Sequence, residues 1–166
     1  MAEEDDPGTT IRCGLSEDEM RERVVDLAFA GDAERFLEFC AVVRGAIPEG
    51  TAAVLRGSAI TGVRHSDGAP FDADGPGTSD LDLTLVGSES LGYYSLDGFY
   101  IPGVHSKPLS DKDPDIAPDL LPLRDHLMAM VGRPVNIQGT RDWIMYFREH
   151  VMNQPYLTLV GKVEST

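Results

Sequence analysis

Asp80 and Asp82 stand two residues apart in the run DLDLTLV, in which polar residues alternate with leucines. Side chains of a strand point alternately to its two faces, so this run predicts a strand with both carboxylates on one face. Two carboxylates about 7 Å apart on one face repel each other unless a cation lies between them. Mg²⁺ commonly takes one or two carboxylates together with water and substrate phosphate. The pair therefore predicts a divalent metal site, although an edge strand with one face in solvent would show the same alternation.

A second feature that suits phosphate chemistry lies upstream, where the apolar run TAAVLR ends at Gly57 and Ser58. Glycine has no Cβ and lets a phosphate group approach the backbone closely. The serine hydroxyl and nearby backbone amides can donate hydrogen bonds to anionic oxygens. A phosphate-binding turn followed by a metal-binding strand predicts a site for a metal-bound phosphate ester.

The order of these motifs resembles that of the nucleotidyltransferase superfamily of DNA polymerase beta-like enzymes. The segments VLRGSAITG and TSDLDLTLV carry the likeness, and the later run LRDHLMAMVGRPVNIQGTRDWIMYF has the family's layout of helix, strand and helix. The resemblance covers roughly residues 51–150. The matching positions are Gly57, Ser58 and Gly62 in Gly-Ser-x-x-x-Gly, and Ser79, Asp80 and Asp82 in Ser-Asp-x-Asp.

The resemblance implies an α/β (α+β) nucleotidyltransferase fold, with a small mixed sheet flanked by helices. It implies a metal-dependent nucleotidyltransferase that moves a nucleoside monophosphate from an NTP to a hydroxyl of a small molecule or protein. Two Mg²⁺ ions would stabilise the attacking and leaving oxygens. The implied roles are catalysis and metal binding for Asp80 and Asp82, and nucleotide binding for Gly57, Ser58, Gly62 and Ser79. The candidates for meeting the phosphate charge are Arg56 and Arg64.

The chain departs from the family pattern at the third acid, which is replaced by Asn136. The asparagine carbonyl can coordinate a metal, so we place Asn136 in the metal site, but an amide cannot accept a proton from an acceptor hydroxyl. The alternative function is a degenerate nucleotidyltransferase domain that acts as a nucleotide-binding or protein-interaction module, antitoxin-like or regulatory, without turnover. The acids that could replace the missing one are Asp67, Asp72, Asp74 and Asp97.

The composition restricts the partners. The 166 residues include 14 Lys and Arg against 28 Asp and Glu, and the formal net charge is −14. A surface this acidic repels a phosphate backbone, so we expect no duplex nucleic acid partner. The start MAEEDD lacks the charge pattern of a signal peptide, and no apolar run approaches the roughly 20 residues that span a bilayer. We therefore expect a cytoplasmic protein without membrane contact, whose partners are an NTP and an unidentified hydroxyl acceptor. The sequence is also compatible with a homodimer.

We expect an acidic disordered tail over residues 1–14 and a single domain over 15–166. Ser16 and Asp32 have the spacing of helix N-caps, and Cys40 falls on the apolar face of the second helix. The aromatic part of the long 88–118 connection either packs on the sheet or stacks on a base, and His105 within it is expected in solvent. The other expected elements are strands at 51–56, 80–86, 133–138 and 156–163, and helices at 119–130 and 140–153.

Overall fold

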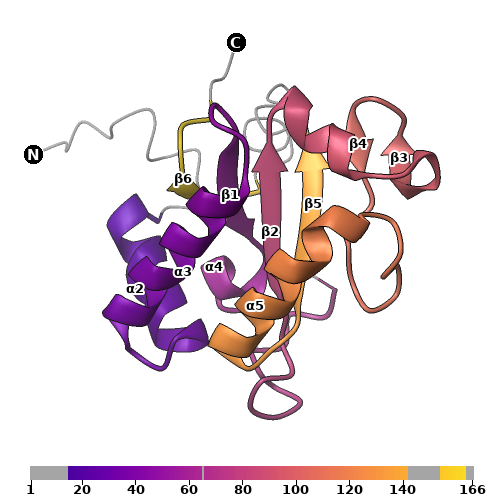
Figure 1. Ribbon diagram of the computed structural model, residues 1–166. Helices are drawn as coiled ribbons and strands as arrows, with labels where there is room; N and C mark the ends of the chain where they lie inside the picture. Colours follow the sequence, from indigo (N-terminus) through magenta and orange to yellow (C-terminus); the bar gives the residue numbers. More distant parts are fainter. Residues whose placement is uncertain (1–14, 65, 142–153, 164–166) are drawn as a thin grey trace, which may run out of the picture.

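The computed structural model describes residues 15–64, 66–141 and 154–163. It forms a mixed α/β arrangement, in which helices cover one face of a six-stranded sheet (Figure 1). The expected tail over residues 1–14 and most of the helix expected over 140–153 lie outside the described residues. No helix in the described part of the chain is long and apolar enough to cross a membrane.

The sheet has the strand order β3-β4-β5-β2-β1-β6. Strands β2 and β5 are parallel, and the other neighbouring strands are antiparallel. Because β2 lies between β1 and β5, the edge-strand interpretation of the acid-bearing strand is wrong. The strands are β1 (Ala52–Arg56), β2 (Leu81–Val86), β3 (Phe99–Ile101), β4 (His105–Ser106), β5 (Val135–Thr140) and β6 (Leu157–Val160).

Local signals set the ends of the long helices. The Ser16 hydroxyl accepts from the Glu19 amide at 3.1 Å before α2, and the Asp32 carboxylate accepts from the Arg35 amide at 3.1 Å before α3. Gly132, with a φ of 65°, ends α5 in the left-handed conformation that suits glycine. These caps confirm the expected helix boundaries. The three helices are α2 (Glu17–Ala28), α3 (Ala33–Ala46) and α5 (Leu121–Val131).

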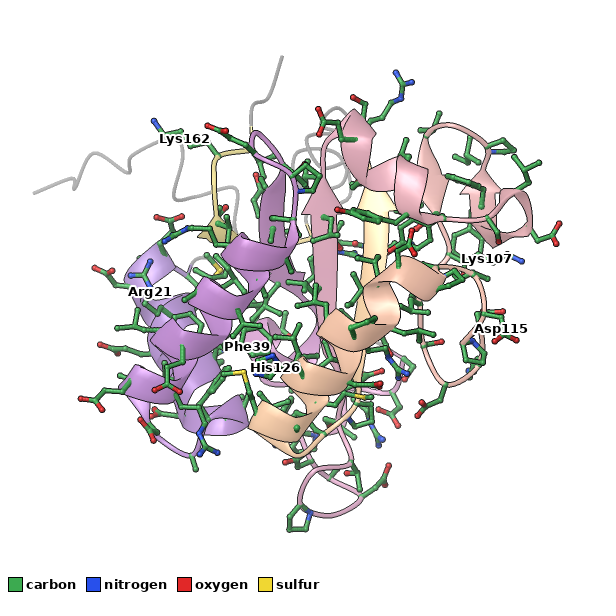
Figure 2. All side chains as sticks on the ribbon, in the orientation of Figure 1. Arg21, Phe39, Lys107, Asp115, His126 and Lys162 are labelled. Carbon is green, nitrogen blue, oxygen red and sulfur yellow. The ribbon has the colours of Figure 1, made fainter. Side chains whose placement is uncertain are left out.

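The hydrophobic core lies between these helices and one face of the sheet. Alternate residues of β2 point into it, as the period-two pattern predicts, and Phe39 fills its centre from α3 (Figure 2). Cys40 is buried beside it as expected, and burial raises the pKa of its thiol to about 11.

The opposite face of the sheet is polar at one end and apolar at the other. Thr84 and Gln138 are buried on it in the middle of β2 and β5, two residues beyond Asp82 and Asn136. Toward the other end of β2, a small apolar cluster forms around Val54, Val86 and Tyr156. Buried polar groups need hydrogen-bond partners, so the polar end of this face must be organised by specific contacts.

The 88–118 connection is more regular than a loop, because it adds β3 and β4 to the sheet edge and contains two 3-10 helices, while a third begins at its last residue. The Tyr94 hydroxyl donates to the Ile137 carbonyl at 2.6 Å, and the Tyr94 and Phe99 rings pack edge to face. The packing interpretation therefore holds for these two aromatic residues. The 3-10 helices are η1 (Ser88–Tyr93), η2 (Leu96–Gly98) and η3 (Pro118–Leu120).

Candidate functional site

The predicted site residues meet at the end of the sheet where β1 finishes and where β2 and β5 begin (Figure 1). In the strand register, Asp82 lies opposite Arg56 of β1 and opposite Asn136 of β5. Residues paired across strands share a face, so the three side chains lie on the same side of the sheet. The turn at Gly57 and the short helix α4 (Ser58–Thr61) follow directly from β1.

Asn136 bridges the two aspartates. Its Nδ2 lies 2.6 Å from Oδ2 of Asp80 and 3.3 Å from Oδ1 of Asp82. An amide nitrogen carries two hydrogens and can donate to both carboxylates, which reduces their repulsion. Coordination through the Asn136 carbonyl was expected, but here the amide presents its nitrogen to the acids, because the two carboxylates need a donor between them.

The Asp82 carboxylate is held in an unfavourable environment. Burial and the neighbouring Asp80 carboxylate raise its pKa to about 6, against the lowering effects of the Asn136 hydrogen bond and of Arg56. An acid with a strongly raised pKa near the start of a central strand is a candidate for a functional role. A bound cation would remove much of this cost.

Gly57 approaches Asp82 more closely than any other residue type could. Its φ is 89° and its ψ is −156°, a conformation that side-chain-bearing residues rarely adopt. A Cβ at this position would come within 2.6 Å of Oδ2 of Asp82. The glycine therefore places bare backbone against the acid pair, and Ser58 follows with a hydroxyl that makes no hydrogen bond to the described residues.

Gly62 has a structural role in the turn after α4, which differs from the nucleotide-binding role that its motif predicts. Its φ is 81°, and its amide donates to the Ser58 carbonyl at 2.7 Å, which closes α4. Arg23 of α2 donates to the last carbonyls of the same turn. A groove of about 480 Å³ beside Gly62 is lined by three acids of α2 and by Arg23, so acids outnumber the cation there. These acids are Glu19, Glu22 and Asp26.

Arg56 is engaged across the polar face of the sheet. Its Nε donates to Oγ1 of Thr84 at 3.0 Å, and its Nη2 donates to Oε1 of Gln138 at 2.9 Å. Its charge lowers the pKa of Asp82. Arg56, which was predicted to meet the charge of a phosphate, thus lies beside the acid pair in a fixed orientation.

Ser79 is part of a structural cluster. Its hydroxyl accepts from the Asp72 amide at 2.8 Å, and its own amide donates to Oδ1 of Asp72 at 2.9 Å. Arg133 donates to both oxygens of Asp72, at 2.8 and 3.0 Å, and to the Ser79 carbonyl. The Arg133 guanidinium also lies over the Phe71 ring. Through these bonds Ser79 fixes the loop that leads into β2 and so positions the start of that strand.

We expect Asp72→Asn to lower the free energy of unfolding at pH 7 by about 1–2 kcal/mol. The Arg133 guanidinium holds the pKa of Asp72 at about 2, below its usual 3.8. The native state therefore binds fewer protons than the unfolded chain, and this stabilisation is lost as pH falls from about 4 through 2. Urea unfolding of the wild type and of Asp72→Asn at pH 7 and pH 2.5 measures this difference in stability. An equal difference between variant and wild type at both pH values would contradict the assignment.

The acids considered as replacements for the missing third acid are held elsewhere. Arg64 forms ion pairs with Asp67 at 3.1 Å and Asp74 at 2.6 Å, and Arg133 holds Asp72. Asp97 is exposed in η2, beyond the far end of β2. An arginine-paired carboxylate is a weak base, so the expectation that one of these acids takes over is not supported.

Four further residues shape the site but were not selected from the sequence for it. Thr84 and Gln138 hold Arg56, and Arg133 holds the loop that leads into β2. His105, expected in solvent, is 4% exposed, and its Nε2 lies 3.0 Å from Nε2 of Gln138. Thr84 and Gln138 lie two residues beyond Asp82 and Asn136, so the period of the strand was the signal available for them.

Comparisons with protein-family models, with curated proteins and with solved structures find no match for this chain. Within the described residues, no group of three or more His, Cys, Asp or Glu side chains is placed to hold a metal ion. The candidate site therefore stands on two carboxylates, one amide and the glycine turn beside them.

Proposed function

We propose that this chain is a metal-dependent nucleotidyltransferase, whose site lies between the Gly57–Ser58 turn and the acid pair. The observation that carries the proposal is the contact of Gly57 with Asp82, where a Cβ would come within 2.6 Å of Oδ2. Bare backbone, a serine hydroxyl and two acids converge there, so a phosphate on the turn would also lie next to a cation on the acids. A structural turn has no need for a buried acid with a pKa near 6.

The donor set fits a divalent cation. Oδ2 of Asp80 and Oδ1 of Asp82 already converge on one atom, Nδ2 of Asn136. Rotation of the amide would exchange this nitrogen for the carbonyl oxygen and add a third oxygen ligand. When bound, Mg²⁺ would neutralise the carboxylates and stabilise negative charge on the phosphate oxygens.

Each residue of the site would have its own role in binding the cation or the phosphate groups. Asp80 and Asp82 hold the cation, and the Ser58 hydroxyl with the backbone at Gly57 donates to phosphate oxygens. Arg56, paired with Asp82 in register, supplies positive charge beside it. This arrangement orients the α-phosphorus of an NTP for in-line attack by a hydroxyl, with pyrophosphate as the leaving group.

We expect at least one of ATP, GTP, CTP and UTP to bind stoichiometrically in calorimetric titrations with Mg²⁺, and not without it. Asp80→Ala/Asp82→Ala should abolish this binding. The matched control is Asp67→Ala/Asp74→Ala, which removes the same charge from the loop acids that Arg64 holds. If all four nucleotides fail to bind, or if both double variants bind equally, the proposed site is wrong.

A second function is favoured by one observation, the amide bridge of Asn136. A neutral donor between the two acids stabilises the pair without a cation and removes the acid that would accept the proton. The chain would then be a nucleotide-binding or protein-interaction module without turnover.

Pyrophosphate release, measured across a panel of hydroxyl acceptors, separates the two functions. We expect release from the wild-type chain if it is an enzyme, and from Asn136→Asp alone if only the third acid is missing. If Asn136→Asp also stays inactive while nucleotide still binds through Asp80 and Asp82, the binding module is the correct interpretation. Asn136→Leu serves as the control of similar size without any ligand atom.

A further inference from the structure

We propose that Arg133 and Asp72 are positioning residues, which fix the Asp80 carboxylate within the acid pair of the candidate site. This inference rests on the proposed function, because it names the residues that keep one of the two metal ligands in place. Neither Arg133 nor Asp72 would contact the cation or the nucleotide. Their effect on cation binding would act through the backbone beside Asp80.

The sheet holds the two acids in different ways. Asp82 lies inside β2, where it is paired in register with Arg56 of β1 and with Asn136 of β5. Asp80 lies one residue before β2, and the pairing with β1 and β5 does not include it. Strand pairing therefore fixes the backbone of Asp82 on both sides, whereas the position of Asp80 needs other contacts.

Two consecutive residues hold the backbone on the two sides of Asp80. Nη1 of Arg133 donates to the Ser79 carbonyl at 2.9 Å. The Leu81 amide donates to the Pro134 carbonyl, also at 2.9 Å. Because the groups before and after Asp80 are both fixed, its Cα has little freedom to move. The first of these two contacts depends on the orientation of a side chain.

Asp72 sets that orientation. Nη1 of Arg133 donates to Oδ1 of Asp72 at 2.8 Å, and Nη2 donates to Oδ2 at 3.0 Å. A bidentate pair of this kind fixes the plane of the guanidinium. The ring centroid of Phe71 lies 4.6 Å from Cζ of Arg133, and the Arg133 side chain is 7% exposed, so water offers little competition for these bonds.

The loop that carries Asp72 is itself fixed to the start of β2. The Asp72 amide donates to the Ser79 hydroxyl at 2.8 Å, and the Ser79 amide donates to Oδ1 of Asp72 at 2.9 Å. The loop also packs closely on the end of α5, because a Cβ at Gly77 would come within 2.9 Å of the Gly132 carbonyl. Arg133, Asp72 and Ser79 thus form a closed cluster, in which each residue contacts the other two.

With its backbone held in this way, Asp80 meets the rest of the candidate site. Its Oδ2 lies 2.6 Å from Nδ2 of Asn136, which also lies 3.3 Å from Oδ1 of Asp82. Mg²⁺ demands near-ideal geometry, so a shift of about 1 Å at Asp80 would weaken its binding. Groups that orient metal ligands from outside typically contribute about 10-fold to 100-fold to metal affinity. The cluster is therefore expected to influence cation affinity without contacting the cation.

The test measures the affinity for Mn²⁺, which prefers the same oxygen ligands as Mg²⁺, by electron paramagnetic resonance of the free ion. We expect Asp72→Asn and Arg133→Gln each to weaken Mn²⁺ binding by about 10-fold. The direction is decisive for Arg133→Gln, because the loss of a positive charge should strengthen cation binding if Arg133 acted through its charge alone. Unchanged or tighter binding in Arg133→Gln would overturn the inference.

A second measurement follows the geometry without any metal. The side-chain amide of Asn136 is assigned in NMR spectra by its absence from Asn136→Leu. In Asp72→Asn and Arg133→Gln, its proton signals should move toward those of a free amide, because Asp80 no longer accepts its hydrogen bond at 2.6 Å. An amide that does not shift in these folded variants would contradict the positioning role.

The matched control is Asp111→Asn, which makes the same substitution in another ion pair with a buried arginine. Asp111 accepts from Arg124 at 2.9 Å, and this pair does not include a neighbour of Asp80. Asp111→Asn should leave both the Asn136 amide and the Mn²⁺ affinity unchanged. If Arg133→Gln does not fold, Arg133→Lys replaces it. Lysine keeps the charge but cannot form the paired bonds, so it should also weaken Mn²⁺ binding by about 10-fold.

The outcomes separate this inference from the proposed function. A wild-type chain that binds neither Mn²⁺ nor any nucleotide would overturn the proposed function, and this inference with it. If the wild type binds Mn²⁺ and the folded variants at positions 72 and 133 bind it equally well, this inference alone is wrong. Weaker binding in these variants together with a shifted Asn136 amide would support both.

Discussion

Asp82→Asn is expected to raise the free energy of unfolding by about 2–3 kcal/mol at pH 8 and, in the same protein, to abolish Mg²⁺-dependent nucleotide binding. Burial and the charge of Asp80 raise the pKa of Asp82 from 3.8 to about 6, so the ionised carboxylate destabilises the fold at neutral pH. Asparagine has nearly the same shape and carries no charge. It can still accept a hydrogen bond from the Asn136 amide.

The sign of the pH dependence follows from proton binding. Between pH 4 and pH 6, the native state holds a proton on Asp82 that the unfolded chain has released, so wild-type stability falls as pH rises through this range. Above pH 6, the full cost of about 3 kcal/mol is present. Asp82→Asn removes this cost, and the variant should therefore gain most at pH 8 and nothing near pH 4.

Urea unfolding at a series of pH values between 4 and 8 measures this difference. The matched variant is Asp72→Asn, which makes the same substitution at an acid whose pKa is lowered, and which should destabilise the chain at pH 8. A variant at position 82 that is less stable than the wild type at pH 8, or whose difference does not change with pH, would contradict the assignment. If Asp82→Asn raises the free energy of unfolding at pH 8 while Asp72→Asn lowers it, position 82 is one where the native acid reduces stability in exchange for function.

Helix ends and strand periodicity could be predicted from the sequence because they depend on neighbours along the chain. Ser16 and Asp32 cap the helices that follow them through bonds to residues three positions later. The strand around Asp82 was found from its period of two, which is equally local. Tertiary contacts were not needed for any of these inferences.

The partners of the site residues depend on strand pairing and loop paths, which the local pattern does not contain. Asn136 lies 54 positions from Asp82, and its amide meets the acid only because β2 and β5 pair in parallel register. Ser79 matched a nucleotide-binding position by its motif, yet the preceding loop folds back so that the Asp72 amide donates to its hydroxyl. The alternation in β2 was also compatible with one face in solvent, whereas Thr84 on that face is completely buried.

Gly57→Ala is the second variant with a large expected effect, a loss of about 2–4 kcal/mol in the free energy of unfolding. Alanine would have to adopt a φ near 89° with a ψ near −156°, and its Cβ would collide with Oδ2 of Asp82 at 2.6 Å. Gly50 has nearly the same φ, 87°, but nothing lies within 4 Å of a Cβ built there. Gly50→Ala therefore reports backbone strain without a collision, and it should cost about 1–2 kcal/mol.

A second substitution tests whether the collision itself accounts for the difference. In Gly57→Ala/Asp82→Ala, the carboxylate that the new Cβ would meet is absent, so we expect the double variant to recover at least about 1 kcal/mol relative to the sum of the single effects. Thermal or urea unfolding of the four proteins in this cycle gives the coupling directly. If the two substitutions are additive, Gly57 is required for its backbone conformation alone. A positive coupling would mean that the glycine is required because the turn is packed against Asp82, which is the arrangement that a ligand bridging the turn and the acid pair needs.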